Sequence, residues 1–164
     1  MKRSLSNVFV GLLLIVIAGC GFQLRGATDL PDSLQTMYIQ GISLKNGLGL
    51  ELKRGLTRNG VSIVNSYQSG SAVLTILENK SERRILSVDR DAKVSEYEIH
   101  SSVKFSVSDD QGQLLSEAQQ VEAQRDYQFD QDQVLGKDEE EQLLREQLNQ
   151  QLVQSILRRL SVLK

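Results

Sequence analysis

"SEYEIHSSVKFSVSD", residues 95–109, carries the pattern that decides the fold. Apolar side chains occur at alternate positions of this stretch, and polar side chains lie between them. The apolar set is Tyr97, Ile99, Val103, Phe105 and Val107, and the polar set is Glu96, Glu98, His100, Ser102, Lys104 and Ser106. A period of two residues predicts a β-strand with one buried face and one solvated face.

This strand has a partner on its C-terminal side. The sequence Asp109-Asp110-Gln111-Gly112 predicts a tight turn, and a second strand is expected over residues 114–129. Its apolar residues also share one side: Val121, Ala123, Tyr127 and Phe129. The two strands therefore predict a long antiparallel hairpin.

Two amphipathic helices flank the strands. The first is expected from Leu44 to Arg58, because leucines recur there every four residues and Asn59-Gly60 supplies a stop signal. The second lies near the C-terminus, where the four-residue repeat is Leu144, Leu148, Leu152, Ile156 and Leu160. Asp138 and Glu141 have the spacing of a capping box, which predicts the start of this helix.

Shorter apolar runs complete the element order. Strands are expected at 37–40, 61–64 and 72–77, and the last of these is so apolar that it should be central in the sheet. The order is β-α-β-β-β-β-α. It predicts the α+β class: a single-domain sandwich of a mostly antiparallel sheet with two helices on one face.

The N-terminus predicts a targeting segment. Lys2 and Arg3 precede the apolar run 8–18, which is shorter than the roughly 20 residues of a bilayer-spanning helix, so we expect a secretory signal. Residues 17–20, Ile-Ala-Gly-Cys, are similar to the bacterial lipobox, in which the cysteine is lipidated. We expect a removed signal at 1–19, a lipidated linker at 20–35 and one domain at 36–164. A plain signal peptide with a chance cysteine is the alternative.

Composition narrows the possible chemistry. The formal net charge is −2, without the basic surplus of a nucleic-acid-binding domain. Cys20 is the only cysteine and His100 the only histidine, so neither a thiolate site nor a histidine zinc site is expected. We interpret His100 as a solvated strand residue, and we predict a protein that is no enzyme and holds neither metal nor cofactor.

Three segments together carry a family resemblance. "GCGFQLRG" (19–26), "SVDRDAKVSEYEI" (87–99) and "GKDEEEQLLREQLNQQLVQSILRRL" (136–160) resemble the lipopolysaccharide-assembly lipoprotein family LptE. The resemblance implies a non-enzymatic plug inside the β-barrel LptD that assists barrel assembly and binds lipopolysaccharide during its insertion into the outer membrane. Lipid on Cys20 would hold the chain in the inner leaflet of that membrane, facing the periplasm and the barrel lumen.

The resemblance also implies two ligand-binding residues. Arg90 and Lys137 match positions where the family carries basic groups, and such groups suit the phosphates of lipopolysaccharide. The alternative function is a stand-alone lipoprotein that faces the periplasm and binds a small ligand or an envelope component. Under that alternative, Arg90 and Lys137 are ordinary solvated charges.

Overall fold

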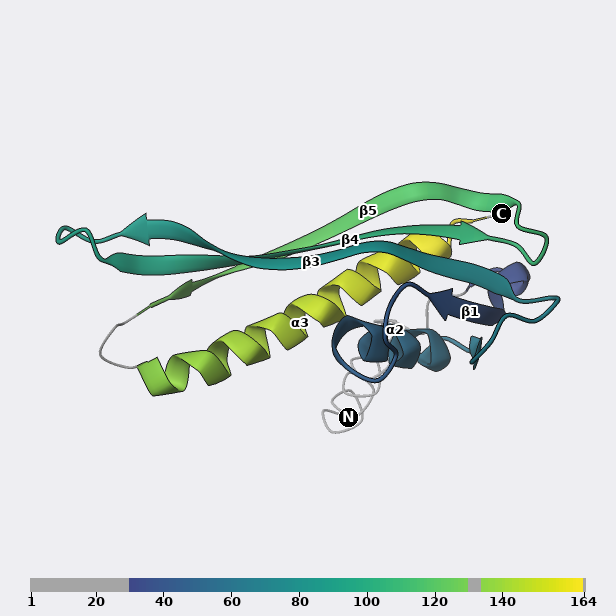
Figure 1. Cartoon of the computed structure of the whole chain (residues 1–164), viewed down its shortest axis with the longest axis horizontal. Coiled ribbons are helices and arrows are strands. Elements are labelled where there is room, and N and C mark those ends of the chain that lie inside the picture. Colours follow the sequence, from purple (N-terminus) through teal and green to yellow (C-terminus); the bar gives the residue numbers. More distant parts are fainter. Residues whose placement is uncertain (1–29, 130–133, 164) are drawn as a thin grey trace, which may run out of the picture.

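The computed structural model describes residues 30–129 and 134–163, and for residues 134–137 it describes the backbone alone. A 3-10 turn, η1 (Asp32–Leu34), leads into five strands and two helices (Figure 1). In chain order these are β1 (Thr36–Gln40), α2 (Gly47–Arg58), β2 (Ser62–Val64), β3 (Ala72–Val88), β4 (Val94–Ser108), β5 (Leu114–Gln128) and α3 (Val134–Leu160). The predicted order β-α-β-β-β-β-α is confirmed, while the expected signal segment and Cys20 lie outside the described residues.

The five strands form one mixed sheet in the order β2-β1-β3-β4-β5. The short strand β1 runs parallel to both β2 and β3, whereas β3, β4 and β5 form a long antiparallel meander. β3 is the middle strand, as its apolar first half predicts. The antiparallel ladders are by far the longer ones, because β1 meets β3 over Met37–Gln40 only.

The end predicted for β3 is wrong. The strand was expected to stop at Leu77, yet it pairs with β4 as far as Val88. Residues 78–84 are all polar, so the apolar pattern that marks the first half of the strand stops there although the extended backbone continues. The ladder to β4 holds this polar half in place, and that pairing is a long-range interaction which local pattern does not reveal.

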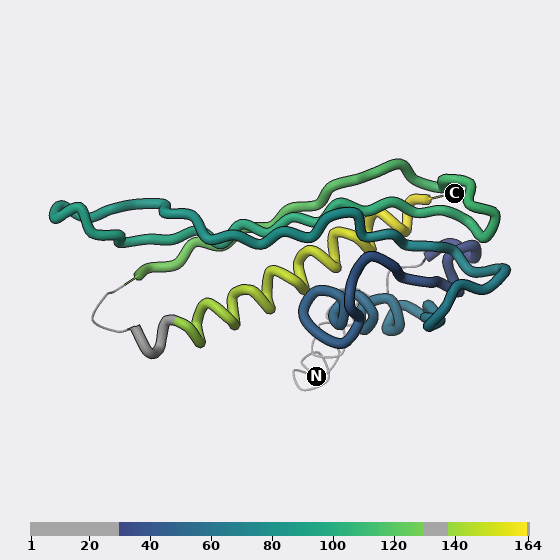
Figure 2. The backbone as a smooth tube through the Cα atoms, in the orientation of Figure 1, coloured from purple at the N-terminus to yellow at the C-terminus, as the bar shows by residue number. Residues whose placement is uncertain are grey.

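Both helices cover the same face of the sheet, as predicted (Figures 1 and 2). The repeat in α3 is buried from Leu148 onward, and the core residues of α3 are Leu148, Leu152, Val153, Ile156, Leu157 and Leu160. Gly55 of α2 lets the two helices approach closely, because a Cβ built there would lie 2.6 Å from Cγ1 of Val153. The packing of α2 against α3 therefore explains a glycine that weakens α2 as an isolated helix.

Both helix starts differ from the prediction. α2 begins at Gly47 instead of Leu44, with Asn46 as its N-cap residue. α3 begins at Val134, so Asp138 and Glu141 lie inside the helix and do not form a capping box at its start. The side chain of Glu141 contacts the sheet instead.

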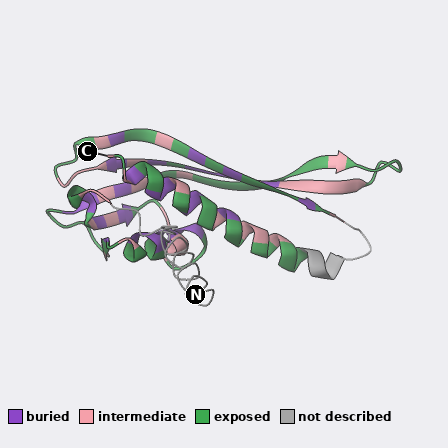
Figure 3. Cartoon of the chain, turned by 180° about the vertical axis from the view of Figure 1, so that it is seen from behind, coloured by how far each residue is buried: buried purple, intermediate pink, exposed green. Residues whose placement is uncertain are grey.

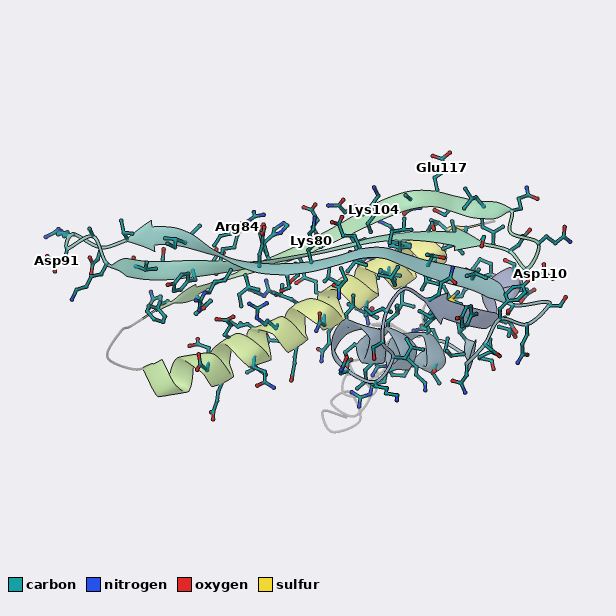
Figure 4. All side chains as sticks on the ribbon, viewed as in Figure 1. Lys80, Arg84, Asp91, Lys104, Asp110 and Glu117 are labelled. Carbon is teal, nitrogen blue, oxygen red and sulfur yellow. The ribbon has the colours of Figure 1, made fainter. Side chains whose placement is uncertain are left out.

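Within the described residues, no helix lies over the other face of the sheet (Figure 3). Lys80, Arg84 and Lys104 project from it, away from α2 and α3 (Figure 4). The core therefore lies between the sheet and the helices, where Phe105, Ile99 and Leu74 are at most 1% exposed. The molecule presents one face of polar strand residues and one face of helices.

Candidate functional site

Arg90 lies in the turn between β3 and β4. This turn, which holds the labelled Asp91, is at the tip of the hairpin and far from α2 (Figure 4). Asp89 shapes the turn, because its Oδ1 accepts the backbone N–H groups of Asp91 at 2.8 Å and of Lys93 at 2.9 Å. Ala92 completes it with a φ of +61°, in the left-handed region that favours glycine. Arg90 is exposed and makes no hydrogen bond or ion pair with another described residue.

The structure does not test the other two predicted site residues. Lys137 belongs to the first turn of α3, where only the backbone is described. Cys20 precedes the first described residue. Their roles in binding and lipidation therefore stay predictions.

A polar cluster that sequence reasoning missed is centred on Glu141 of α3. Its Oε2 accepts hydrogen bonds from the hydroxyl of Tyr127 at 2.8 Å and from Nη1 of Arg83 at 3.1 Å. Its Oε1 accepts Nε and Nη2 of Arg145 at 3.0 Å and 2.7 Å. One carboxylate thus joins β3, β5 and α3, and we call Arg83, Tyr127, Glu141 and Arg145 the Glu141 cluster.

The cluster continues across the underside of the hairpin. Nη1 of Arg145 donates to Oγ of Ser81 at 2.6 Å, and Ser81 shares a 2.8 Å hydrogen bond with Ser101 of β4. The guanidinium of Arg83 lies 4.5 Å from the ring centre of Tyr97, a cation–π contact. An open cleft of about 490 Å³ lies beside these groups, lined by Arg83, Asp138, Glu141, Gln142 and Arg145.

The Glu141 cluster also sets the protonation of its members. Partial burial alone would raise the pKa of Glu141, but the hydrogen bonds from Arg145 and Tyr127 and the two positive charges outweigh it. The pKa of Glu141 is therefore below its ordinary value. Burial and the bond to the Glu141 carboxylate raise the pKa of Tyr127. Glu141 stays charged and Tyr127 stays protonated at neutral pH, as their hydrogen bond requires.

The sequence offered only a weak signal for this cluster. Glu141 stands in a run of four acidic residues that is typical of a helix start, and Arg83 lies beyond residue 77, where the strand was expected to end. Ser81 and Arg83 are two positions apart, so both lie on the strand face that turns toward α3. This shared face can be inferred only once residues 78–88 are known to form a strand.

The remaining chemistry-bearing groups are few. His100, expected to be solvated, is half-buried, and its Nε2 lies 3.5 Å from Oε2 of Glu122 on β5. Within residues 30–129 and 134–163, no group of three His, Cys, Asp or Glu side chains could hold a metal ion. No helix in the same described ranges is long and apolar enough to cross a membrane.

The fold and the Glu141 cluster together define a class: an α+β domain whose charged groups brace its own sheet against a helix. Comparison with known proteins makes this specific. A model of the family LptE, described as "Lipopolysaccharide-assembly", matches residues 34–160. The chain belongs to the LptE family, as the sequence resemblance implied.

Individual relatives agree with this assignment. The LPS-assembly lipoprotein LptE of Photorhabdus laumondii is 25% identical over 160 residues, covering 98% of this chain and 87% of that protein. The solution structure of an uncharacterized lipoprotein B from Nitrosomonas europaea has a TM-score of 0.71 and 30% identity, covering 86% of this chain and 90% of that one. A minor lipoprotein from Acinetobacter baumannii has a TM-score of 0.65 and 28% identity, covering 77% and 90%.

Proposed function

We propose that this chain is an outer-membrane lipoprotein that lodges inside a partner β-barrel of the LptD type and assists the insertion of lipopolysaccharide. The observation that carries the proposal is the match of the LptE family model across nearly the whole described domain. Lipid on Cys20 would hold the chain at the inner leaflet. A lipid anchor of two or three long acyl chains is stable because each buried CH₂ contributes ~0.8 kcal/mol.

The surface of the domain supports a role inside a barrel. A water-filled barrel lumen is lined by polar side chains, so a protein that fills it needs a polar exterior around a closed core. The uncovered sheet face meets this need, with the exposed Lys104 of β4 between Glu78 of β3 and Gln120 of β5. The core beneath it is closed, and the described part of the chain leaves no buried side-chain polar atom without a partner.

The hairpin tip supports contact with a phosphate-bearing ligand. Arg90 is exposed and free of protein partners within the described residues, so its guanidinium is available for a bidentate bond to a phosphate. The carboxylate of Asp89 repels a phosphate at Arg90 less than its charge suggests, because its Oδ1 accepts hydrogen bonds from two backbone N–H groups of the turn. We propose on this basis that Arg90 binds lipopolysaccharide, and we propose the same role for Lys137 on the family resemblance alone.

Co-purification tests the proposed function. The affinity-tagged full chain, extracted in mild detergent, should bring down a large β-barrel protein. Lys104→Glu should reduce barrel recovery, while the unfolding free energy of the free chain changes by no more than ~0.5 kcal/mol, because Lys104 is exposed. Lys53→Glu makes the same charge change on the exposed side of α2 and serves as the matched control.

The alternative function gives a different result. A stand-alone lipoprotein would leave detergent extracts without any barrel protein, whatever residue occupies position 104. Equal loss of barrel recovery and of stability in Lys104→Glu would show that position 104 supports the fold and is not a contact surface.

A further inference from the structure

Four glutamine side chains form an uncharged stripe on α3. Gln147, Gln150, Gln151 and Gln154 are all exposed, and no amide of the four has a hydrogen-bond partner among the described residues. They lie three or four residues apart, so they share one side of the helix. Each primary amide offers two donors and one acceptor carbonyl. The stripe is therefore a row of unused neutral hydrogen-bonding groups.

This stripe lines a cleft of about 460 Å³ that three elements build together. α2 contributes Glu51 and Arg58, and β5 contributes Arg125. Arg125 has the same strand parity as the buried Val121 and Ala123, so it lies on the helix-covered side of the edge strand. The volume is within the range of small-molecule binding sites. The cleft exists only because α2 and β5 flank α3.

The two arginines of this cleft are unusual in being unpaired. Most described arginines bond to an acidic, amide or hydroxyl group, as Arg54 does with Glu51 at 2.7 Å. Within the described ranges, only Arg58, Arg90 and Arg125 have neither a hydrogen bond nor an ion pair. Two of these three guanidinium groups thus line one cleft, beside the four free amides.

The lining excludes several kinds of ligand. It contains no aromatic ring on which a nucleotide base could stack, and Val153 is its one aliphatic side chain. Its single carboxylate, Glu51, is paired with Arg54, so a metal cation finds no ligand set. Amide groups match hydroxyl groups, which both donate and accept, and guanidinium groups match carboxylates or phosphates. A hydroxyl-rich molecule with an acidic group satisfies the whole lining.

We propose that the cleft lined by Arg58, Arg125 and the glutamine stripe of α3 binds an acidic oligosaccharide. The two guanidinium groups hold the acidic group, and the amides bond to sugar hydroxyls. The inference goes beyond the proposed function, which places ligand contact at Arg90 and Lys137. Two envelope sources carry this chemistry: the acidic sugars of a lipopolysaccharide core and the glycan of the cell wall.

Calorimetric titration of the detergent-solubilised full chain tests the proposal with three anionic probes. They are trigalacturonate, the core oligosaccharide released from lipopolysaccharide, and glycan fragments of digested peptidoglycan. At least one should bind saturably, and Arg58→Gln combined with Arg125→Gln should raise its Kd at least tenfold. Maltotriose, which lacks an acidic group, should bind at least tenfold more weakly than the probe that binds best.

Matched controls separate a built site from general attraction of anions. Arg90→Gln removes the third free guanidinium and should leave the Kd unchanged within a factor of two. Gln147→Ala with Gln151→Ala should weaken binding several-fold, whereas Gln142→Ala, an exposed glutamine of another cleft on α3, should not. Alanine keeps α3 intact in the three glutamine variants, because it has the highest helix propensity.

The results decide the proposal in either direction. The probe whose binding depends on Arg58 and Arg125 identifies the source of the saccharide. The proposal is overturned if no probe binds in that manner, if inorganic phosphate displaces the bound probe at equal concentration, or if Arg90→Gln weakens binding as much as the double variant.

Discussion

Replacing Glu141 with alanine removes an acceptor that three side chains share under the hairpin. The bond from Tyr127 is the best shielded of them, because Tyr127 is only 6% exposed. Loss of a hydrogen bond to a charged acceptor at a buried tyrosine costs about 1–2 kcal/mol. The Arg83 and Arg145 side chains are 45% and 34% exposed, so solvent screens their pairs to about 0.5 kcal/mol each. Glu141→Ala should therefore lower the unfolding free energy by about 2–3 kcal/mol.

Urea unfolding of the solubilised chain measures this effect. Glu141→Gln keeps an acceptor for Tyr127 and loses only the charge. It should therefore lower the unfolding free energy by about 1 kcal/mol, through loss of the two screened ion pairs. Glu139→Ala, an exposed acid two residues earlier in α3, should change stability by no more than ~0.5 kcal/mol. If Glu141→Ala costs no more than Glu139→Ala, the cluster does not brace the hairpin and the reasoning is refuted.

The same cluster predicts a pH dependence with a definite sign. Because the pKa of Glu141 is lower in the folded chain than in the unfolded chain, its stabilisation is fully present above the unfolded pKa. It is lost as pH falls through the folded pKa. The stability difference between the natural chain and Glu141→Gln should therefore shrink steadily when pH is lowered below the ordinary glutamate range. A difference that stays constant down to strongly acidic pH would contradict the assigned charge.

Three further predictions follow from other parts of the chain. Gly55→Ala should destabilise the domain by about 1 kcal/mol despite the better helix propensity of alanine, because its Cβ would lie 2.6 Å from a methyl group of Val153. An increase in melting temperature would contradict the close packing of α2 on α3. Cys20→Ala should abolish palmitate labelling and leave an unprocessed or soluble precursor, and full labelling of this variant would rule out the lipobox. Arg90→Asp combined with Lys137→Asp should weaken lipopolysaccharide binding in a salt-dependent way without affecting barrel co-purification. Binding curves that overlay those of the natural chain at low salt would show that both residues are only solvated charges.

The alternation in residues 95–109, the leucine repeats of the two helices and the shorter apolar runs were enough to predict the α+β class, the element order and most of the core. Both signals are local, because the side-chain period of a strand or helix is written in neighbouring residues. The family resemblance is also a local signal, because it depends on short segments at fixed positions. The apolar first half of β3 likewise predicted a central strand, and the sheet order confirms it.

Tertiary structure alone decided the second half of β3, the true start of α3 and the partners of Glu141. Residues 78–84 are all polar, and only pairing with β4 makes them part of a strand. Glu141 stands in an acidic helical run, and its contacts with Arg83 and Tyr127 depend on how α3 packs against the sheet. The same is true of Arg58 and Arg125, which are 67 positions apart and meet at one cleft through the packing of α2, α3 and β5. A sequence pattern reports which face of its own element a residue occupies. It does not report which residue of a distant element lies opposite, because that depends on packing and register across the whole sheet.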